Sequence, residues 1–123
     1  MAIGRVADTS WLYALFNQAD VHHDDATADV TIPQVTLVPT AIMNEFLDLV
    51  RYRLGKDAAA RALDALQDFP HFDLWYPTEE KEAVAVWTTH PHLSMHDAHV
   101  VACARTAGFE LASFDNRQKA VLS

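Results

Sequence analysis

The sequence predicts an α/β protein with three layers, in which a mainly parallel central sheet lies between two layers of helices. Short apolar segments with strand-like patterns alternate along the chain with helical segments. With 123 residues, half of them hydrophobic, the chain is predicted to form a single domain, residues 1–123. It contains no internal repeat and no low-complexity segment.

The charge and the cysteine content restrict the class of protein. A net charge of −8 argues against a nonspecific nucleic-acid binder, because such proteins gain affinity from cations that displace phosphate counterions. An acidic chain can still cut nucleic acid if its excess carboxylates bind metal, and two divalent cations would halve this charge. A basic protein partner and a salty cytoplasm are the alternative explanations. The single cysteine, the lack of a signal-peptide pattern and the lack of a long apolar run predict a soluble cytoplasmic protein.

The first predicted strand, residues 3–7, leads directly into an acidic residue and a helix. Asp8 follows the strand, and Thr9 and Ser10 are both residues that can cap a helix. The helix after them is interrupted near residues 17–20, and it presents an apolar face of Trp11, Leu12, Leu15 and Phe16.

Four polar residues, His22, His23, Asp24 and Asp25, open a second short helix. Imidazole and carboxylate groups both bind metals, which raises the possibility of a zinc site. Adjacent residues on a helix point in different directions, however, and acids near the positive end of a helix dipole explain this cluster better.

The second predicted strand, residues 34–38, ends at Pro39. Thr40 is the predicted N-cap of a helix over residues 41–54, in which apolar residues form one stripe. Glu45 lies within the first two turns of this helix, at the end that follows the strand.

The densest positive patch of the chain follows this carboxylate. Arg51, Arg53 and Lys56 are predicted to close the helix, and Arg61 lies in the next one, predicted over residues 57–69. Cations at a helix C-terminus interact favourably with the negative end of the helix dipole. The patch is also the place where RNA would bind outside a metal site.

The third predicted strand covers residues 72–76, and a helix with Thr78 as its cap is expected to start in the segment 77–80. The helix is expected to end at residues 88–91. The connection after it is rich in histidine, but the spacing of its histidines fits no compact zinc motif. These histidines are His90, His92, His96 and His99.

The segment 93–117 organises the rest of the chain. Ser94 precedes Asp97 by three residues, which is the spacing of a capping box, and the helix that follows is rich in small residues. Gly108 stops it, and residues 109–114 alternate well enough for a strand that ends before Asp115. A last short strand is expected over residues 120–122.

Each of four acids, Asp8, Glu45, Asp97 and Asp115, lies at a strand end or in the early part of a helix that leads away from the sheet. Any one of them alone is explained as a cap, a turn former or a surface residue. In a parallel sheet, however, these points lie at one edge, and four converging carboxylates repel one another unless a cation lies among them. Hard oxygen ligands favour Mg²⁺ or Mn²⁺, which support phosphodiester hydrolysis. Ser10 and Ser113 could orient the carboxylates or cap the local backbone.

Four segments, ADTSWLYAL, TAIMNEFLDLV, LSMHDAHVVACA and LASFDNR, occur in this order over essentially the whole chain. Together they resemble a PIN domain of the VapC toxin type. The resemblance implies a metal-dependent endoribonuclease, usually a homodimer paired with an antitoxin that blocks the acidic site. The family's acidic positions correspond to Asp8, Glu45, Asp97 and Asp115, and its Ser/Thr position corresponds to Ser113.

The sequence departs from the family pattern at two places. No aromatic residue follows Asp115, because the next residues are Asn116, Arg117 and Gln118. Gly4 and Arg5 also interrupt the apolar run of the first strand.

Two other functions compete with the toxin hypothesis. One is a PIN nuclease that processes or degrades RNA without an antitoxin, and the other is an acidic domain that binds a protein and has lost catalysis. The apolar helical surfaces of residues 41–69 are the predicted dimer interface.

Overall fold

The computed structural model describes residues 4–122, which form four strands and seven helices. The strands are β1 (Gly4–Ala7), β2 (Val35–Pro39), β3 (Phe72–Tyr76) and β4 (Glu110–Ala112). The helices are α1 (Thr9–Phe16), α2 (His23–Val30), α3 (Thr40–Leu54), α4 (Lys56–Asp68), α5 (Glu80–Thr89), α6 (Met95–Ala107) and α7 (Asn116–Leu122). All strand pairs are parallel, in the order β3-β2-β1-β4, which confirms the predicted parallel α/β fold.

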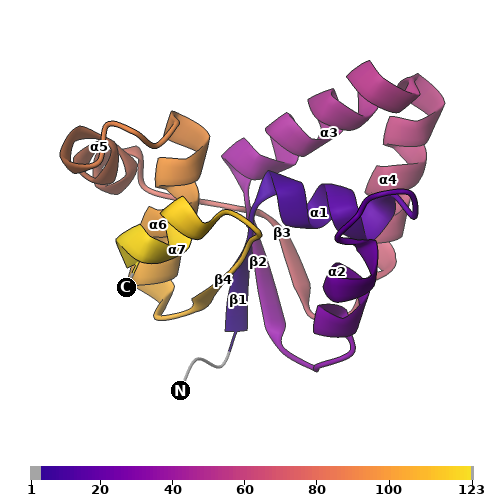
Figure 1. The fold of residues 1–123 in the computed structure, drawn as a ribbon, viewed down its shortest axis with the longest axis horizontal. Coiled ribbons are helices and arrows are strands. Elements are labelled where there is room, and N and C mark those ends of the chain that lie inside the picture. Colours follow the sequence, from indigo (N-terminus) through magenta and orange to yellow (C-terminus); the bar gives the residue numbers. More distant parts are fainter. Residues whose placement is uncertain (1–3, 123) are drawn as a thin grey trace.

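The helices cover both faces of this sheet. Helices α1 to α4 lie on one side of it, and α5 to α7 lie on the other (Figure 1). Helix α6 is buried on two sides: Val100 and Cys103 belong to the main apolar core, whereas Ala98 and Val101 pack in a second cluster with residues of α5. The small residues of this helix let it fit between two such layers.

The order of the strands creates a switch point beside β1. The chain runs outward from β1 through β2 to β3 and then returns to place β4 on the other side of β1. Open α/β sheets bind ligands at the carboxyl ends of strands where the direction of winding reverses. The Asp8 backbone N–H bonds the Ala112 carbonyl at 3.2 Å, so the segments after β1 and β4 leave the sheet side by side.

Two residues that interrupt the apolar pattern of β1 have packing reasons. A Cβ at Gly4 would lie 2.5 Å from the ring of Phe109, so only glycine lets that ring pack on the strand. Arg5 is buried, and its guanidinium donates to Thr36 Oγ1 at 2.8 Å and to the Asp29 carbonyl at 2.6 Å. It also lies 5.5 Å from the Trp11 ring, and these contacts tie α2 to the sheet.

Three predicted caps are wrong. Asp8 itself caps α1, in place of Thr9 or Ser10, because its carboxylate reaches the N–H of Trp11. Helix α3 already includes Thr40, and no side chain caps its start. Thr78 lies too far ahead of α5, which begins at Glu80, and its hydroxyl is buried without a hydrogen-bond partner.

The C-terminal prediction is also wrong. Residues 120–122 belong to α7 and not to a strand. The prediction failed because a three-residue apolar run is too short to distinguish the period of a helix from that of a strand. In the helix, Val121 and Leu122 pack against two different apolar clusters, and Arg105 donates to the Val121 carbonyl at 2.8 Å.

Several element boundaries differ slightly from the prediction. Strand β4 covers only three residues, β2 runs one residue further into Pro39, and Lys56 starts α4 where it was expected to close the preceding helix. Ile3, the predicted first residue of β1, lies outside the described residues. No helix within residues 4–122 is long and apolar enough to cross a lipid bilayer.

Candidate active site

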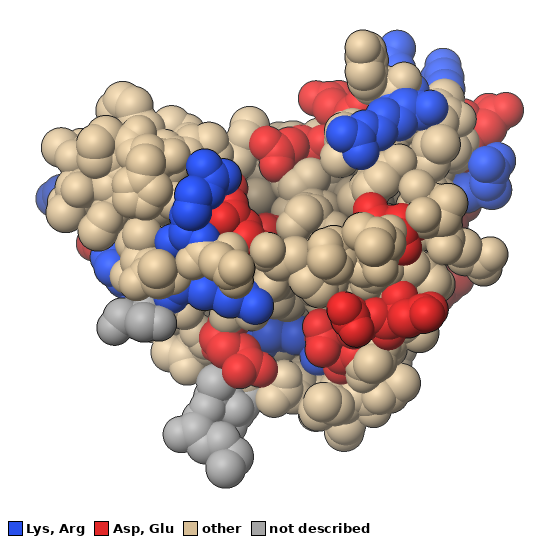
Figure 2. Space-filling model, in the orientation of Figure 1, with Lys and Arg blue, Asp and Glu red and all other residues tan. Residues whose placement is uncertain are grey.

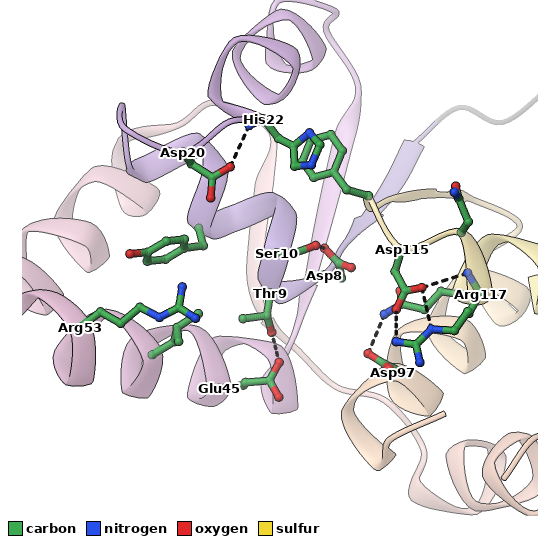
Figure 3. A pocket seen from close by; sticks show the side chains of 15 residues that line it. Asp8, Thr9, Ser10, Asp20, His22, Glu45, Arg53, Asp97, Asp115 and Arg117 are labelled. Atoms are coloured by element: carbon green, nitrogen blue, oxygen red, sulfur yellow. Dashed lines mark hydrogen bonds and ion pairs between the residues drawn. The ribbon is translucent and has the colours of Figure 1, made fainter. Parts of the chain in front are cut away.

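A cleft of about 700 Å³ opens at the carboxyl edge of the sheet. Figure 2 shows acidic side chains inside a hollow at this edge, with basic side chains on both of its sides. All four acids predicted from the sequence line the cleft: Asp8, Glu45, Asp97 and Asp115. Figure 3 shows them approaching it from the segment after β1, from α3, from α6 and from the segment before α7.

Asp8 is the most deeply placed of the four acids, with 3% of its surface exposed. Its carboxylate accepts hydrogen bonds from the Trp11 N–H at 2.8 Å, the Ser10 hydroxyl at 2.9 Å and the Ser113 hydroxyl at 2.5 Å. Burial nevertheless raises the pKa of Asp8 above its ordinary value, since it outweighs these donors and the charge of Asp97 adds to it. A charge buried in this way favours a nearby cation.

Ser113, a predicted supporting residue, connects two of the acids. It is buried, donates to Asp8, and accepts the backbone N–H of Asp115 at 2.9 Å. Ser10, the other predicted supporting residue, is exposed and lines the cleft beside Asp8. Both hydroxyls therefore orient Asp8.

Glu45 reaches the cleft from the second turn of α3. One of its oxygens accepts a short hydrogen bond from the Thr9 hydroxyl, and the other lies 2.5 Å from Nδ1 of His96 on α6. The sequence showed His96 only as one of four histidines with no assigned partner. Its contact with Glu45 spans 51 positions of sequence, which no local pattern can reveal.

Asp97 occupies the predicted capping position, but its side chain does not complete a capping box. The Asp97 N–H donates to the Ser94 hydroxyl at 3.1 Å, whereas the carboxylate accepts from Nε2 of Gln118 at 2.6 Å. Gln118 is 2% exposed, and its Oε1 is buried without a hydrogen-bond partner. Gln118 was not predicted as a site residue, because no helix was expected at this position of the chain.

Asp115 forms an ion pair with Arg117, at 3.2 Å between carboxylate oxygen and guanidinium nitrogen. It also accepts the Arg117 backbone N–H at 2.9 Å, which fixes the first turn of α7. The hydrogen bonds and charge of Arg117 lower the pKa of Asp115. A basic side chain of the chain itself therefore already occupies one side of this carboxylate.

The structure divides the predicted basic patch. Only Arg53 lines the cleft, where its guanidinium lies 5.1 Å from the centre of the Tyr13 ring. Arg51, Lys56 and Arg61 are exposed on α3 and α4 and are not among the residues that line the cleft.

The two adjacent histidines of the polar cluster point to different places. His22 lines the cleft and stacks on Phe114, whereas Nδ1 of His23 lies 2.7 Å from the Ala14 carbonyl. Their separation agrees with the sequence argument against a zinc site at this cluster.

The donor chemistry of the cleft fits a hard divalent cation, since the lining offers oxygen ligands around one buried charge that needs compensation. These are the hydroxyls of Thr9 and Ser10 and five carboxylates: the four predicted acids and Asp20. Within residues 4–122, no three His, Cys, Asp or Glu side chains lie close enough together to hold one ion. Each of Glu45, Asp97 and Asp115 instead contacts a partner side chain of the same chain. Side-chain rotation would be needed to gather them on a cation.

Comparisons with known proteins agree with this description. A family model described as the PIN domain matches residues 5–122. Among solved structures, the chain is similar to the crystal structure of Mycobacterium tuberculosis VapC20, described as a sarcin-ricin loop cleaving toxin, with a TM-score of 0.82 and 23% sequence identity. The match covers 95% of this chain and 94% of that chain, and at this identity it shows a shared fold. No curated protein matches the sequence.

Proposed function

Because the chain belongs to the PIN domain family, we propose that it is a metal-dependent endoribonuclease that hydrolyses RNA phosphodiester bonds. The observation that carries this proposal is the placement of Asp8, Glu45, Asp97 and Asp115 around one cleft at the switch point of the sheet. Here one of them is buried at a cost that a cation would offset.

The four carboxylates are the residues that would hold Mg²⁺ or Mn²⁺. Such a cation supplies a Lewis acid that activates water and neutralises charge on the phosphate and the leaving oxygen. Asp8 contributes a fixed carboxylate, because Ser10, Ser113 and the Trp11 N–H hold it in one orientation. Among the lining residues, Arg53 and Arg117 provide the positive charge that draws an RNA backbone to an otherwise acidic cleft.

We also propose that the protein is the toxin of a toxin-antitoxin pair, acts on cytoplasmic RNA and forms a homodimer. The shared fold with VapC20, described as a toxin, and the VapC-like motifs of the sequence support this assignment. The cognate antitoxin would block the acidic cleft. A PIN nuclease without an antitoxin and a noncatalytic interaction domain remain the alternatives.

Cleavage of a total-RNA pool by the purified protein with Mn²⁺ or Mg²⁺ tests the catalytic proposal. The controls are EDTA and Asp97→Asn, which keeps an oxygen that can accept from Gln118 and so preserves the local contacts. Asp64→Asn changes the net charge equally at an exposed position on α4 and serves as the matched control. We expect discrete fragments that disappear with EDTA and with Asp97→Asn but persist with Asp64→Asn.

The outcome also separates the alternatives. Intact RNA under every condition, after purification under denaturing conditions and refolding to remove a bound inhibitor, would contradict the nuclease assignment and favour the interaction domain. If the protein cuts RNA and the product of the neighbouring gene does not inhibit this cleavage, the result would support a nuclease without an antitoxin.

A further inference from the structure

The cleft is larger than the acidic site requires. Its volume of about 700 Å³ lies within the range of pockets that enclose whole small molecules. Figure 3 shows that Asp97, Asp115 and Arg117 lie on one side of it, whereas Asp20, His22 and Arg53 lie toward the other side. The second part of the cleft is lined by rings, the cation of Arg53 and the carboxylate of Asp20, and the catalytic proposal assigns no role to the rings.

The ring of His22 is held in a defined orientation at this rim. It stacks on Phe114 with ring centres 4.2 Å apart and an angle of 13° between the rings. The His22 N–H donates to the Asp20 carboxylate at 2.8 Å, which fixes the backbone that carries the ring. His22 is exposed, whereas Phe114 is half-buried and supports it from behind. The result is a supported, solvent-facing aromatic surface.

A second planar pair lines the same cleft. Tyr13 is buried, and the guanidinium of Arg53 lies over its ring. Arg53 comes from the last turn of α3, so its charge lies at the edge of the cleft, where the contact with the Tyr13 ring restricts its side chain. Planar rings with a nearby cation are the features with which proteins bind unstacked bases and the phosphates between them.

The His22 ring supported by Phe114, here called the ring platform, is joined to the acids by three consecutive residues. Ser113 holds Asp8, Phe114 supports His22, and Asp115 is one of the four carboxylates. This short segment fixes the position of the ring platform relative to the acidic site. A base bound at the platform would therefore place one particular phosphate of its strand at the acids.

We propose that His22, supported by Phe114, is a stacking site for an unpaired nucleobase close to the cleaved phosphate. The base must be unpaired, because a base stacked inside a duplex exposes no free face to a side chain. The site would select the position of cleavage within single-stranded or looped RNA. This inference rests on the proposed ribonuclease function.

The test uses a short RNA that contains a cleavage site mapped from the total-RNA experiment. A series of these RNAs carries one abasic nucleotide at each position around the cut. We expect one abasic position to raise KM by about 5- to 150-fold with kcat retained, because a base stacked on an aromatic ring contributes about 1–3 kcal/mol. His22→Ala should raise KM for the intact RNA by a similar factor, and it should add no further loss with that abasic RNA.

Two further variants separate stacking from other effects. His22→Phe keeps a ring at the platform and should restore the KM of the wild type. His92→Ala removes an exposed histidine that does not line the cleft and should leave both kinetic parameters unchanged. Thermal melting of each variant without metal verifies that it is folded.

The outcomes distinguish this inference from the proposed function. If the wild type cuts RNA but every abasic RNA is cut equally well, or if His22→Ala matches the wild type, the stacking site is wrong and the nuclease assignment stands. A fall in kcat with unchanged KM would also contradict it, because it would assign His22 to the chemical step. If the wild type cuts no RNA, both proposals fail together.

Discussion

The two walls of the cleft hold their acids in different ways. On the wall formed by β1 and α1, Asp8 is buried and receives three hydrogen bonds from a backbone N–H and two hydroxyls. On the wall formed by α6 and α7, Asp97 and Asp115 are partly exposed and are held by the long side chains of Gln118 and Arg117. The first arrangement is rigid, whereas the second can rearrange by rotation of side chains.

This difference assigns different tasks to the two walls. Three hydrogen bonds hold the buried Asp8 carboxylate in place but leave it acceptor capacity for a cation, so Asp8 defines where the cation would bind. Asp97 and Asp115 can adjust, but they must first exchange the contacts that α7 offers. We therefore expect changes on the rigid wall to abolish function and changes on the α7 wall to tune the affinity for metal.

The largest effect is expected from Asp8→Asn, which removes the charge but retains an oxygen that can cap α1. Supporting partners of metal ligands alone contribute about 10–100-fold, so loss of a ligand should reduce cleavage by at least about 100-fold. Cleavage assays at saturating Mn²⁺ measure this loss. Activity within a few-fold of the wild type would remove Asp8 from the site.

The same variant tests the buried charge through its pH dependence. Burial raises the pKa of Asp8, so the folded state binds this proton more tightly than the unfolded state does. The charged carboxylate therefore costs stability as the pH rises through the folded-state pKa. We expect Asp8→Asn to have a higher Tm than the wild type above that pKa in metal-free buffer, with this advantage absent below pH ~3.9. A lower Tm of the variant at neutral pH would show that the hydrogen bonds to the charged carboxylate outweigh its burial.

A smaller effect is expected from Gln118→Met, which removes the donor to Asp97 and also the buried, unpartnered oxygen. The metal-free fold should persist, because Met fills a similar volume and leaves no polar atom unsatisfied. The Mn²⁺ concentration for half-maximal thermal stabilisation should rise by about 10–100-fold. Gln67→Met, at an exposed position of α4, is the matched control and should leave that concentration unchanged. An unchanged Mn²⁺ midpoint for Gln118→Met would show that Asp97 needs no orienting partner.

The smallest effect, in the opposite direction, is expected from Arg117→Gln. Arg117 competes with a cation for Asp115, so its removal should lower the Mn²⁺ midpoint by a few-fold. Removal also lets the pKa of Asp115 rise toward its ordinary value. The metal-free Tm should change little, since exposed ion pairs contribute little to stability. Arg61→Gln makes the same change of net charge outside the cleft. Equal midpoints for the two variants would mean that Arg117 acts only through net charge.

The same contrast explains which site residues were predictable. Asp8 and Asp115 follow strands, and the parallel pairing of β1 and β4 brings such positions together. Glu45 and Asp97 lie early in helices that start at this edge of the sheet, so the strand and helix pattern located them as well. Gln118 and His96 were not assigned because their contacts join elements far apart in the chain.

The strand and helix pattern predicted the parallel α/β class and the edge of the sheet at which Asp8, Glu45, Asp97 and Asp115 lie. These features depend on the period of apolar residues and on the position of polar residues at strand ends, which are local properties. Only the tertiary structure showed that residues 120–122 are helical, that Gln118 and Arg117 engage the acids, and that Phe114 supports His22. Those features depend on packing energies between distant segments, which decide the conformation of a segment whose own pattern is too short to do so.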